Sequence, residues 1–107
     1  MDNIIEIKGK KRKYSFSVYP LCHTFKKVND WSVIYIYLYN DNLIYCGKDS
    51  NFPSRLNYHK IYDKNILSKS NLIAIYYLNP QSISLAEVET DILEGNQFEI
   101  NIHHNLK

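Results

Sequence analysis

The sequence feature that most constrains the fold is a nine-residue run rich in β-branched and aromatic residues, Trp31 to Tyr39. Such side chains favour extended backbone because they pack well on a pleated surface. The turn sequence Asn40-Asp41-Asn42 separates this run from a second apolar run, Leu43 to Cys46. The sequence therefore predicts a β-hairpin here, ended by Gly47.

A second hairpin is predicted at the N-terminus, around a Gly9-Lys10 turn. Apolar residues alternate with polar ones on both arms: Ile5, Ile7, Tyr14, Phe16 and Val18. Pro20 ends the second arm. Five basic residues gather at the tip: Lys8, Lys10, Lys11, Arg12 and Lys13. A solvated turn and a phosphate-contacting patch are equally good readings of this cluster, because a net charge of +2 does not by itself indicate nucleic-acid binding.

The rest of the chain mixes helices and strands. The expected elements are a helix from Pro53 to about Ile61, a polar surface loop from Asp63 to Asn71, a buried strand from Leu72 to Leu78, a helix from Ser82 to Glu94 and an extended tail from Phe98 to Ile102. Ser84 and Glu87 have capping-box spacing, and Gly95 follows the last helix. This order predicts an α/β or α+β fold, and 107 residues suffice for one core.

The two cysteines, Cys22 and Cys46, favour a reducing compartment. The sequence has no signal-peptide pattern and no apolar run long enough to span a bilayer. We therefore expect an intracellular, cytoplasmic protein with free thiols that does not engage a membrane. Cys22 and His23, with His103 and His104, lack the regular spacing of a zinc site, so zinc is not expected.

Glu89 is expected on the apolar face of the last helix, beside Leu85, Ile92 and Leu93. The other acidic residues of that helix form a separate stripe: Glu87, Asp91 and Glu94. A carboxylate on an apolar face has to be paired, neutralised or bound to a cation. Spacing alone favours a salt bridge to Arg55 modestly over a metal ligand.

Three further candidate residues each have a plain structural interpretation when taken singly: Tyr35, Tyr45 and His59. The tyrosines fit core positions with satisfied hydroxyls, and a lone histidine is most often structural or at the surface. Together with Arg55 and Glu89, they form a set on elements that can converge. This set, rather than any single member, indicates an active site.

The ordered residues resemble the GIY-YIG nucleases. Val33-Ile34-Tyr35 and Tyr45-Cys46-Gly47 are similar to the paired tripeptides that name the family, with Val33 and Cys46 in place of a glycine and an isoleucine. Further matches follow in order: Lys48 after the second glycine, Arg55, His59 one helical turn later, the Glu89 segment, and Asn101, which lacks the preceding proline. The resemblance covers residues 31 to 101. Neither the glycine nor the isoleucine of the family tripeptides carries a reactive group.

This resemblance implies a small central antiparallel sheet of about three strands flanked by helices. Residues 1–29 would form an N-terminal hairpin and connection, and residues 30–107 the nuclease domain. It also implies a metal-dependent endonuclease that hydrolyses phosphodiester bonds in nucleic acid, with DNA favoured. With such a substrate, the hairpin tip from Lys8 to Lys13 is expected to be an additional contact to the phosphate backbone. Glu89 would hold one Mg²⁺ or Mn²⁺ ion per site. Tyr35 would act as general base, helped by Lys48 and Arg55, while Tyr45 orients water or phosphate, His59 relays a proton and Asn101 positions backbone or Glu89.

Two other interpretations remain open. The same fold with a disabled site would bind nucleic acid or another partner without cleavage. A purely structural role would make the Arg55–Glu89 pair a buried salt bridge in a protein of unrelated function. A domain with one active site also leaves a homodimer open, because cutting both strands of a duplex takes two copies or two binding events.

Overall fold

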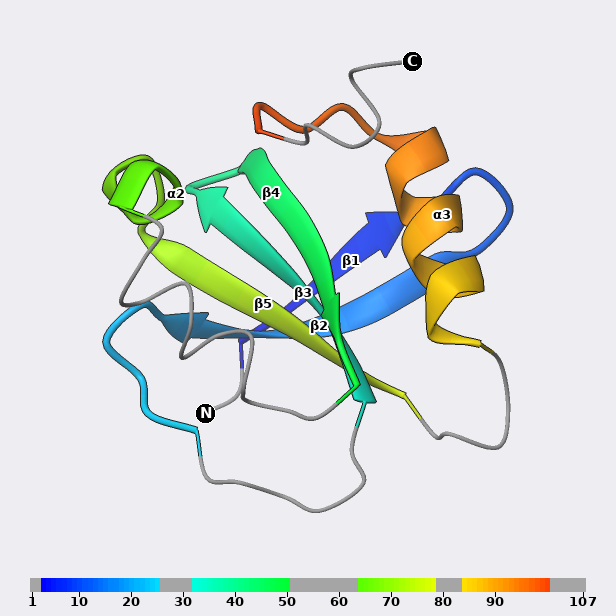
Figure 1. Cartoon of the computed structure of the whole chain (residues 1–107), viewed down its shortest axis with the longest axis horizontal. Coiled ribbons are helices and arrows are strands. Elements are labelled where there is room, and N and C mark those ends of the chain that lie inside the picture. The colour runs from blue at the N-terminus through cyan, green and yellow to red at the C-terminus, as the bar shows by residue number, and fades with distance from the viewer. Residues whose placement is uncertain (1–2, 26–31, 51–63, 79–83, 101–107) are drawn as a thin grey trace.

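The computed structural model describes residues 3–25, 32–50, 64–78 and 84–100. These residues form one antiparallel sheet with two helices (Figure 1). The strands are β1 (Asn3–Lys8), β2 (Lys13–Pro20), β3 (Ser32–Tyr39), β4 (Asn42–Asp49) and β5 (Leu72–Leu78), in the order β1-β2-β5-β3-β4. The helices are α2 (Lys64–Ser68) and α3 (Leu85–Gly95).

The expected sheet of about three strands flanked by helices is wrong. The N-terminal hairpin adds two strands to the same sheet, which makes the fold a five-stranded, sheet-dominated α+β structure. β2 pairs antiparallel with β5, with Ser17 opposite Ile75 and Pro20 opposite Leu72. This pairing satisfies backbone N–H and C=O groups that would otherwise line an open edge of the hairpin.

β3 lies between β5 and β4, and its residues from Val33 to Leu38 are buried. Each face of the sheet therefore carries its own apolar layer. On the face covered by α3, the buried side chains include Phe16, Ile34, Ile36, Val88 and Ile92. On the face covered by α2, they include Val33, Tyr35, Tyr37, Ile66 and Ile75. The two helices lie on opposite sides of the sheet (Figure 1).

α3 forms where the sequence predicted a helix. Ser84 is its N-cap, and the Ser84 Oγ accepts a hydrogen bond from the Glu87 N–H at 3.1 Å. Val88 and Ile92 are four residues apart and fully buried against the sheet. The capping spacing and the apolar period together fix where the helix starts and which side it buries.

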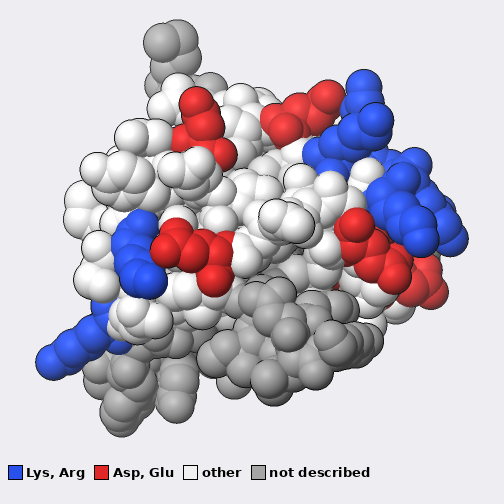
Figure 2. Space-filling model, turned by 90° about the horizontal axis from the view of Figure 1, so that it is seen from above, with Lys and Arg blue, Asp and Glu red and all other residues white. Residues whose placement is uncertain are grey.

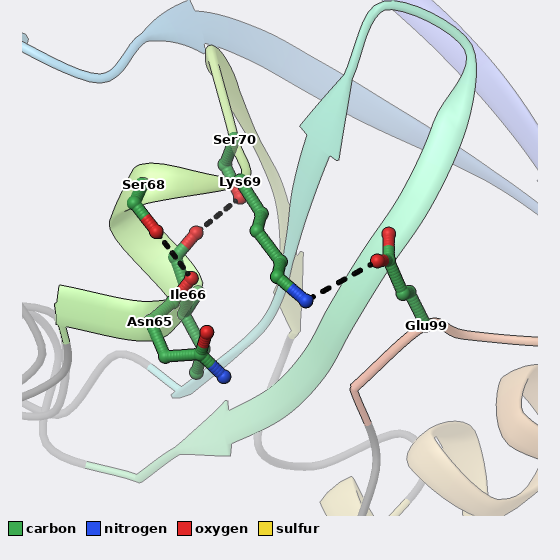
Figure 3. A network of polar contacts seen from close by, with 6 residues as sticks. All are labelled: Asn65, Ile66, Ser68, Lys69, Ser70 and Glu99. Carbon is green, nitrogen blue, oxygen red and sulfur yellow. Dashed lines mark hydrogen bonds and ion pairs between the residues drawn. The ribbon is translucent and has the colours of Figure 1, made fainter.

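The expected surface loop from Asp63 to Asn71 is wrong over residues 64–68, which form α2. The helix buries Ile66 and closes with two side-chain bonds (Figure 3): Ser68 Oγ donates to the Asn65 carbonyl at 3.0 Å, and Ser70 Oγ donates to the Ile66 carbonyl at 2.7 Å. Burial of one isoleucine with local capping stabilises a helix too short for a periodic apolar pattern. The helix predicted from Pro53 to Ile61 lies outside the described residues.

The C-terminal segment covers the beginning of the outer edge of β4. The Glu99 N–H donates to the Leu43 carbonyl at 3.1 Å, and the Ile100 N–H donates to the Ile44 carbonyl at 2.7 Å. Lys69, just after α2, pairs with Glu99 at 3.4 Å (Figure 3). Within the described ranges, no strand pairs with the outer edge of β4 from Tyr45 to Asp49. None of the described helices has the length and apolarity needed to cross a membrane.

Candidate active site

Tyr35 is packed across the edge strand β4. It comes from the central strand β3, is 1% exposed, and lies opposite Gly47 in the β3–β4 ladder. A Cβ atom built at Gly47 would collide with the Tyr35 hydroxyl oxygen and lie 2.5 Å from Cζ. Gly47 was expected to end its strand, but β4 continues through it to Asp49. Its missing side chain instead gives the Tyr35 ring room to reach over β4.

Tyr45 joins Tyr35 on the face of the sheet that carries α2. The two rings have centroids 6.3 Å apart, and Tyr37 makes an edge contact with Tyr35 at 5.9 Å. Tyr45 is half-buried. The structure thus brings together the two tyrosines of the predicted tripeptides, with the Tyr35 hydroxyl over Gly47.

Lys48 and Glu89 form a second pair, on the face that carries α3. Lys48 Nζ lies 3.4 Å from Glu89 Oε1, with the lysine side chain 48% exposed and the glutamate side chain 19% exposed. Glu89 also lies near Cys46: burial, together with the negative charge of Glu89, raises the pKa of the Cys46 thiol well above its usual value. Glu89 is therefore a partly exposed carboxylate whose described cationic partner is Lys48.

The two pairs lie on opposite faces of β4. Successive residues of a strand point to opposite faces, so Tyr45 and Lys48, three positions apart, face opposite ways. β4 is the last strand of the sheet, and its outer edge from Tyr45 onward carries no described strand. A substrate laid along this edge would therefore have the tyrosines on one side and the Lys48–Glu89 pair on the other.

Asp49 is a buried carboxylate that the sequence did not single out. It ends β4, is 2% exposed, and lies opposite Val33 on the same face of the sheet as Tyr35. Its signal in the sequence is weak, because Asp49 was expected to fall in a loop beyond Gly47. Its burial follows from the extra two residues of strand.

Glu89 is the carboxylate that would hold the single hard cation that the resemblance implies. Mg²⁺ prefers oxygen ligands, retains several waters and is commonly held by one or two protein carboxylates. Among the described residues, no group of three or more potential metal ligands gathers. Glu89 is one partly exposed carboxylate, so water and substrate oxygens would have to supply the rest of such a donor set.

Three predicted site residues lie outside the described residues: Arg55, His59 and Asn101. The proposed Arg55–Glu89 salt bridge lies outside them for the same reason. Ile100, which precedes Asn101, is hydrogen-bonded to Ile44 at the beginning of β4.

Asp91 holds the basic hairpin tip against α3, a contact that the sequence did not predict. Its carboxylate accepts hydrogen bonds from the backbone N–H of Lys11 at 2.8 Å, from that of Arg12 at 3.2 Å and from the Tyr14 hydroxyl at 2.7 Å. The Asp91 carbonyl accepts from the Lys10 N–H at 3.0 Å. Asp91 is thus a structural latch between α3 and the turn that joins β1 to β2.

The latch shifts two pKa values in opposite directions. Burial alone would raise the pKa of Asp91, but the bonds from Tyr14, Lys11 and Arg12 and the charge of Arg12 outweigh it and hold this pKa below its usual value. Burial, followed by the hydrogen bond to Asp91, raises the pKa of Tyr14 to about 12. At neutral pH both groups are therefore in the protonation states that form the latch.

Comparisons of the chain with protein-family models, with curated proteins and with solved structures give no match.

Proposed function

We propose that this chain is a metal-dependent endonuclease of the GIY-YIG type that hydrolyses phosphodiester bonds in nucleic acid, with DNA as the favoured substrate. The observation that carries the proposal is the packing of the Tyr35 hydroxyl over Gly47 on β4, the last described strand of the sheet, with Lys48 and Glu89 paired on the other face of that strand. The ordered residue series of the resemblance supports it.

The side chains at this edge suit the needs of phosphodiester hydrolysis. The reaction requires a deprotonated water, a counter-charge on the phosphoryl group and stabilisation of the leaving oxygen. Tyr35 would take the proton from the attacking water. A phenol has an ordinary pKa of about 10, so it needs positive charge nearby to act as a base near neutral pH. Lys48 is the basic residue of β4, but it pairs with Glu89 on the opposite face of the strand from Tyr35, so Arg55 is the candidate for that charge by resemblance.

Tyr45 and Glu89 complete the assignment. Tyr45 is half-buried beside Tyr35 and would orient water or a phosphate oxygen through its hydroxyl. Glu89 would hold one Mg²⁺ or Mn²⁺ ion, which when bound supplies Lewis-acid stabilisation of the phosphate and leaving oxygens. Lys48 pairs with Glu89, and a bound metal ion would take the place of Lys48 beside this carboxylate.

We also infer that the protein works inside the cell, in the cytoplasm. Cys22 is exposed and Cys46 buried, and both are free thiols. An exposed free thiol is compatible with a reducing compartment.

Nicking of supercoiled plasmid tests the proposal. Purified protein with Mg²⁺ is expected to nick or linearise the plasmid, and excess EDTA is expected to abolish the reaction. Tyr35→Phe should lower the rate by about 100-fold or more, the usual contribution of a general base. Tyr39→Phe is the matched control, because Tyr39 is on the same strand and 49% exposed. It should retain the wild-type rate.

Two outcomes would contradict the proposal. Equal rates for Tyr35→Phe and Tyr39→Phe would remove Tyr35 from the reaction. Binding of plasmid, single-stranded DNA and RNA without any cleavage would instead favour the disabled binding module.

A further inference from the structure

The tip of the β1–β2 hairpin is a strongly basic surface that the proposed hydrolysis does not use. We name it the tip patch: Lys8, Lys10, Lys11, Arg12 and Lys13, all exposed. In Figure 2 the Lys and Arg side chains gather at the right-hand end of the molecule, where the β1–β2 turn projects in Figure 1. Five of the 13 basic residues of the chain therefore occupy one turn and its flanks.

Most of this charge is available to a ligand. Lys13 pairs with Glu6 at 3.8 Å, but both side chains are more than 60% exposed, and such surface pairs contribute little. Lys8, Lys10 and Lys11 form no ion pair with any described residue. The Asp91 carboxylate bonds to backbone N–H groups of the tip and to Tyr14, and not to the lysine ammonium groups.

The patch is also held in one conformation. Asp91 accepts three hydrogen bonds from the turn and one from Tyr14 on β2, and Asn96 Nδ2 donates to the Lys8 carbonyl at 2.8 Å. Gly9 is buried against Asp91 and Gly95, with no room for a Cβ atom. A turn fixed in this way loses little conformational entropy when it binds a ligand.

Acidic residues limit where an anion can approach. Lys11 and Arg12 line a groove of about 410 Å³ between the tip and α3, and its opposite wall carries Glu87 and Glu94. These carboxylates repel phosphate from the groove. Lys10 and Lys13 do not line the groove, so the surface open to an anion is the side of the tip turned away from it.

We infer that the tip patch binds a second stretch of the sugar–phosphate backbone of the nucleic acid, and that Asp91 is the positioning residue that holds it there. The inference rests on the proposed function for the identity of the ligand. Phosphate contacts from lysine and arginine give affinity and register without reading sequence.

The placement of the patch sets a minimum length for the substrate. Glu89 and Asp91 are two residues apart on α3, about 200° around the helix axis, so the patch and the β4 edge lie on opposite flanks of α3. A helix with side chains is about 10–12 Å across, and a duplex strand rises about 3.4 Å per nucleotide. A strand that reaches both sites must extend at least about three nucleotides beyond the reacting phosphate. The substrate class is therefore a polynucleotide.

Salt-dependent binding in EDTA tests this inference without requiring cleavage. The probe is a fluorescein-labelled duplex DNA of about 20 base pairs, and the measured quantity is the slope of log Kobs against log salt concentration. Lys10→Gln should weaken binding and reduce the slope by about 0.9, the value for one lost phosphate contact. Lys64→Gln, an exposed lysine on α2, is the matched control and should leave the slope unchanged.

Asp91→Asn separates positioning from net charge. The substitution makes the protein more positive, so a purely electrostatic effect would tighten binding. Loss of the latch should instead weaken binding and lower the slope. Lower stability alone does not change the slope, because the slope reports the number of phosphate contacts that the folded protein makes.

Equal slopes for wild type, Lys10→Gln and Lys64→Gln would overturn the inference, as would a wild type that binds no duplex. Failure of the proposed function looks different: the slopes would change as expected, while Mg²⁺ would produce no cleavage by the wild type.

Discussion

Replacing Gly47 with alanine tests how closely Tyr35 is fitted to the edge strand. The new methyl carbon would lie on the Tyr35 hydroxyl, 2.5 Å from Cζ and 2.9 Å from Cε1. Carbon atoms in contact are ordinarily about 3.5–4.0 Å apart. Tyr35 is 1% exposed and has Tyr37 and Tyr45 beside it, so its ring has no free space into which to turn.

Two opposing terms set the magnitude. Alanine is favoured over glycine inside a strand by about 0.5–1 kcal/mol, because glycine loses more backbone entropy on folding. Overpacking of a buried site costs about 1–3 kcal/mol. We expect Gly47→Ala to lower the free energy of unfolding by about 0.5–2 kcal/mol net, a fall in Tm of several degrees at about 4–8 °C per kcal/mol. The displaced Tyr35 hydroxyl should also lower the rate of plasmid nicking.

Urea unfolding of a double-mutant cycle measures this directly. The cycle compares wild type, Gly47→Ala, Tyr35→Leu and the double variant. Leucine does not reach over Gly47, so in the Tyr35→Leu background the alanine should be neutral or stabilising by up to about 1 kcal/mol. The same cost of Gly47→Ala in both backgrounds would refute the packing of Tyr35 on Gly47.

Three further outcomes are expected from the buried groups and the helix cap. In the native protein Cys22 should react rapidly with Ellman's reagent, whereas Cys46 should react only on unfolding, because burial raises the pKa of its thiol. Rapid reaction of both thiols would contradict this. The stability that the Tyr14 hydroxyl contributes is complete below pH 10 and should be lost as pH rises from 10 through about 12, because the unfolded tyrosine ionises first. Urea titrations across this window should show a shallower loss for Tyr14→Phe, and an identical pH profile would remove Tyr14 as the cause. Ser84→Ala should lower the free energy of unfolding by about 1 kcal/mol, since the cap hydrogen bond from the Glu87 N–H is lost. An unchanged free energy of unfolding would show that this hydrogen bond does not stabilise the protein in solution.

Local patterns predicted the strands and α3 but not the order of the sheet. Both hairpins and β5 follow from alternating or continuous apolar runs bounded by turn residues. The pairing of Ser17 with Ile75 joins segments far apart in the sequence, and no local period encodes it. The expectation of about three strands failed for this reason. α2 was missed because a five-residue helix that buries only Ile66 leaves no repeat to detect.

The candidate site was predicted in part. The sequence placed Tyr35 and Tyr45 on the paired strands of one hairpin, and in the structure their ring centroids lie 6.3 Å apart. The partner of Glu89 was expected to be Arg55, which lies outside the described residues, and the observed ion pair is with Lys48. Lys48 was expected after the end of the strand. Once β4 is seen to run to Asp49, strand alternation places Lys48 on the face that carries α3.

The contacts of Asp91 could not be predicted from the local sequence. Its helical position put it on an acidic stripe with Glu87 and Glu94, apart from the apolar face. Its partners are the N–H groups of Lys11 and Arg12, 79 to 80 residues away in the chain. Whether such a carboxylate meets solvent or the backbone of a turn depends on how the hairpin docks against α3, which no local spacing determines.

The most direct test of the central claim is the rate of plasmid nicking by Glu89→Gln at saturating Mg²⁺, beside Glu94→Gln. Both residues belong to α3, but Glu89 pairs with Lys48 on the flank next to β4, whereas Glu94 is exposed beside the tip groove. Loss of the cation-binding carboxylate should remove several kcal/mol of transition-state stabilisation, a fall in rate of about 100-fold or more. Glu94→Gln should cleave at the wild-type rate. Equal rates for both variants, with both folded, would contradict the assignment of Glu89 as the metal ligand of a nuclease.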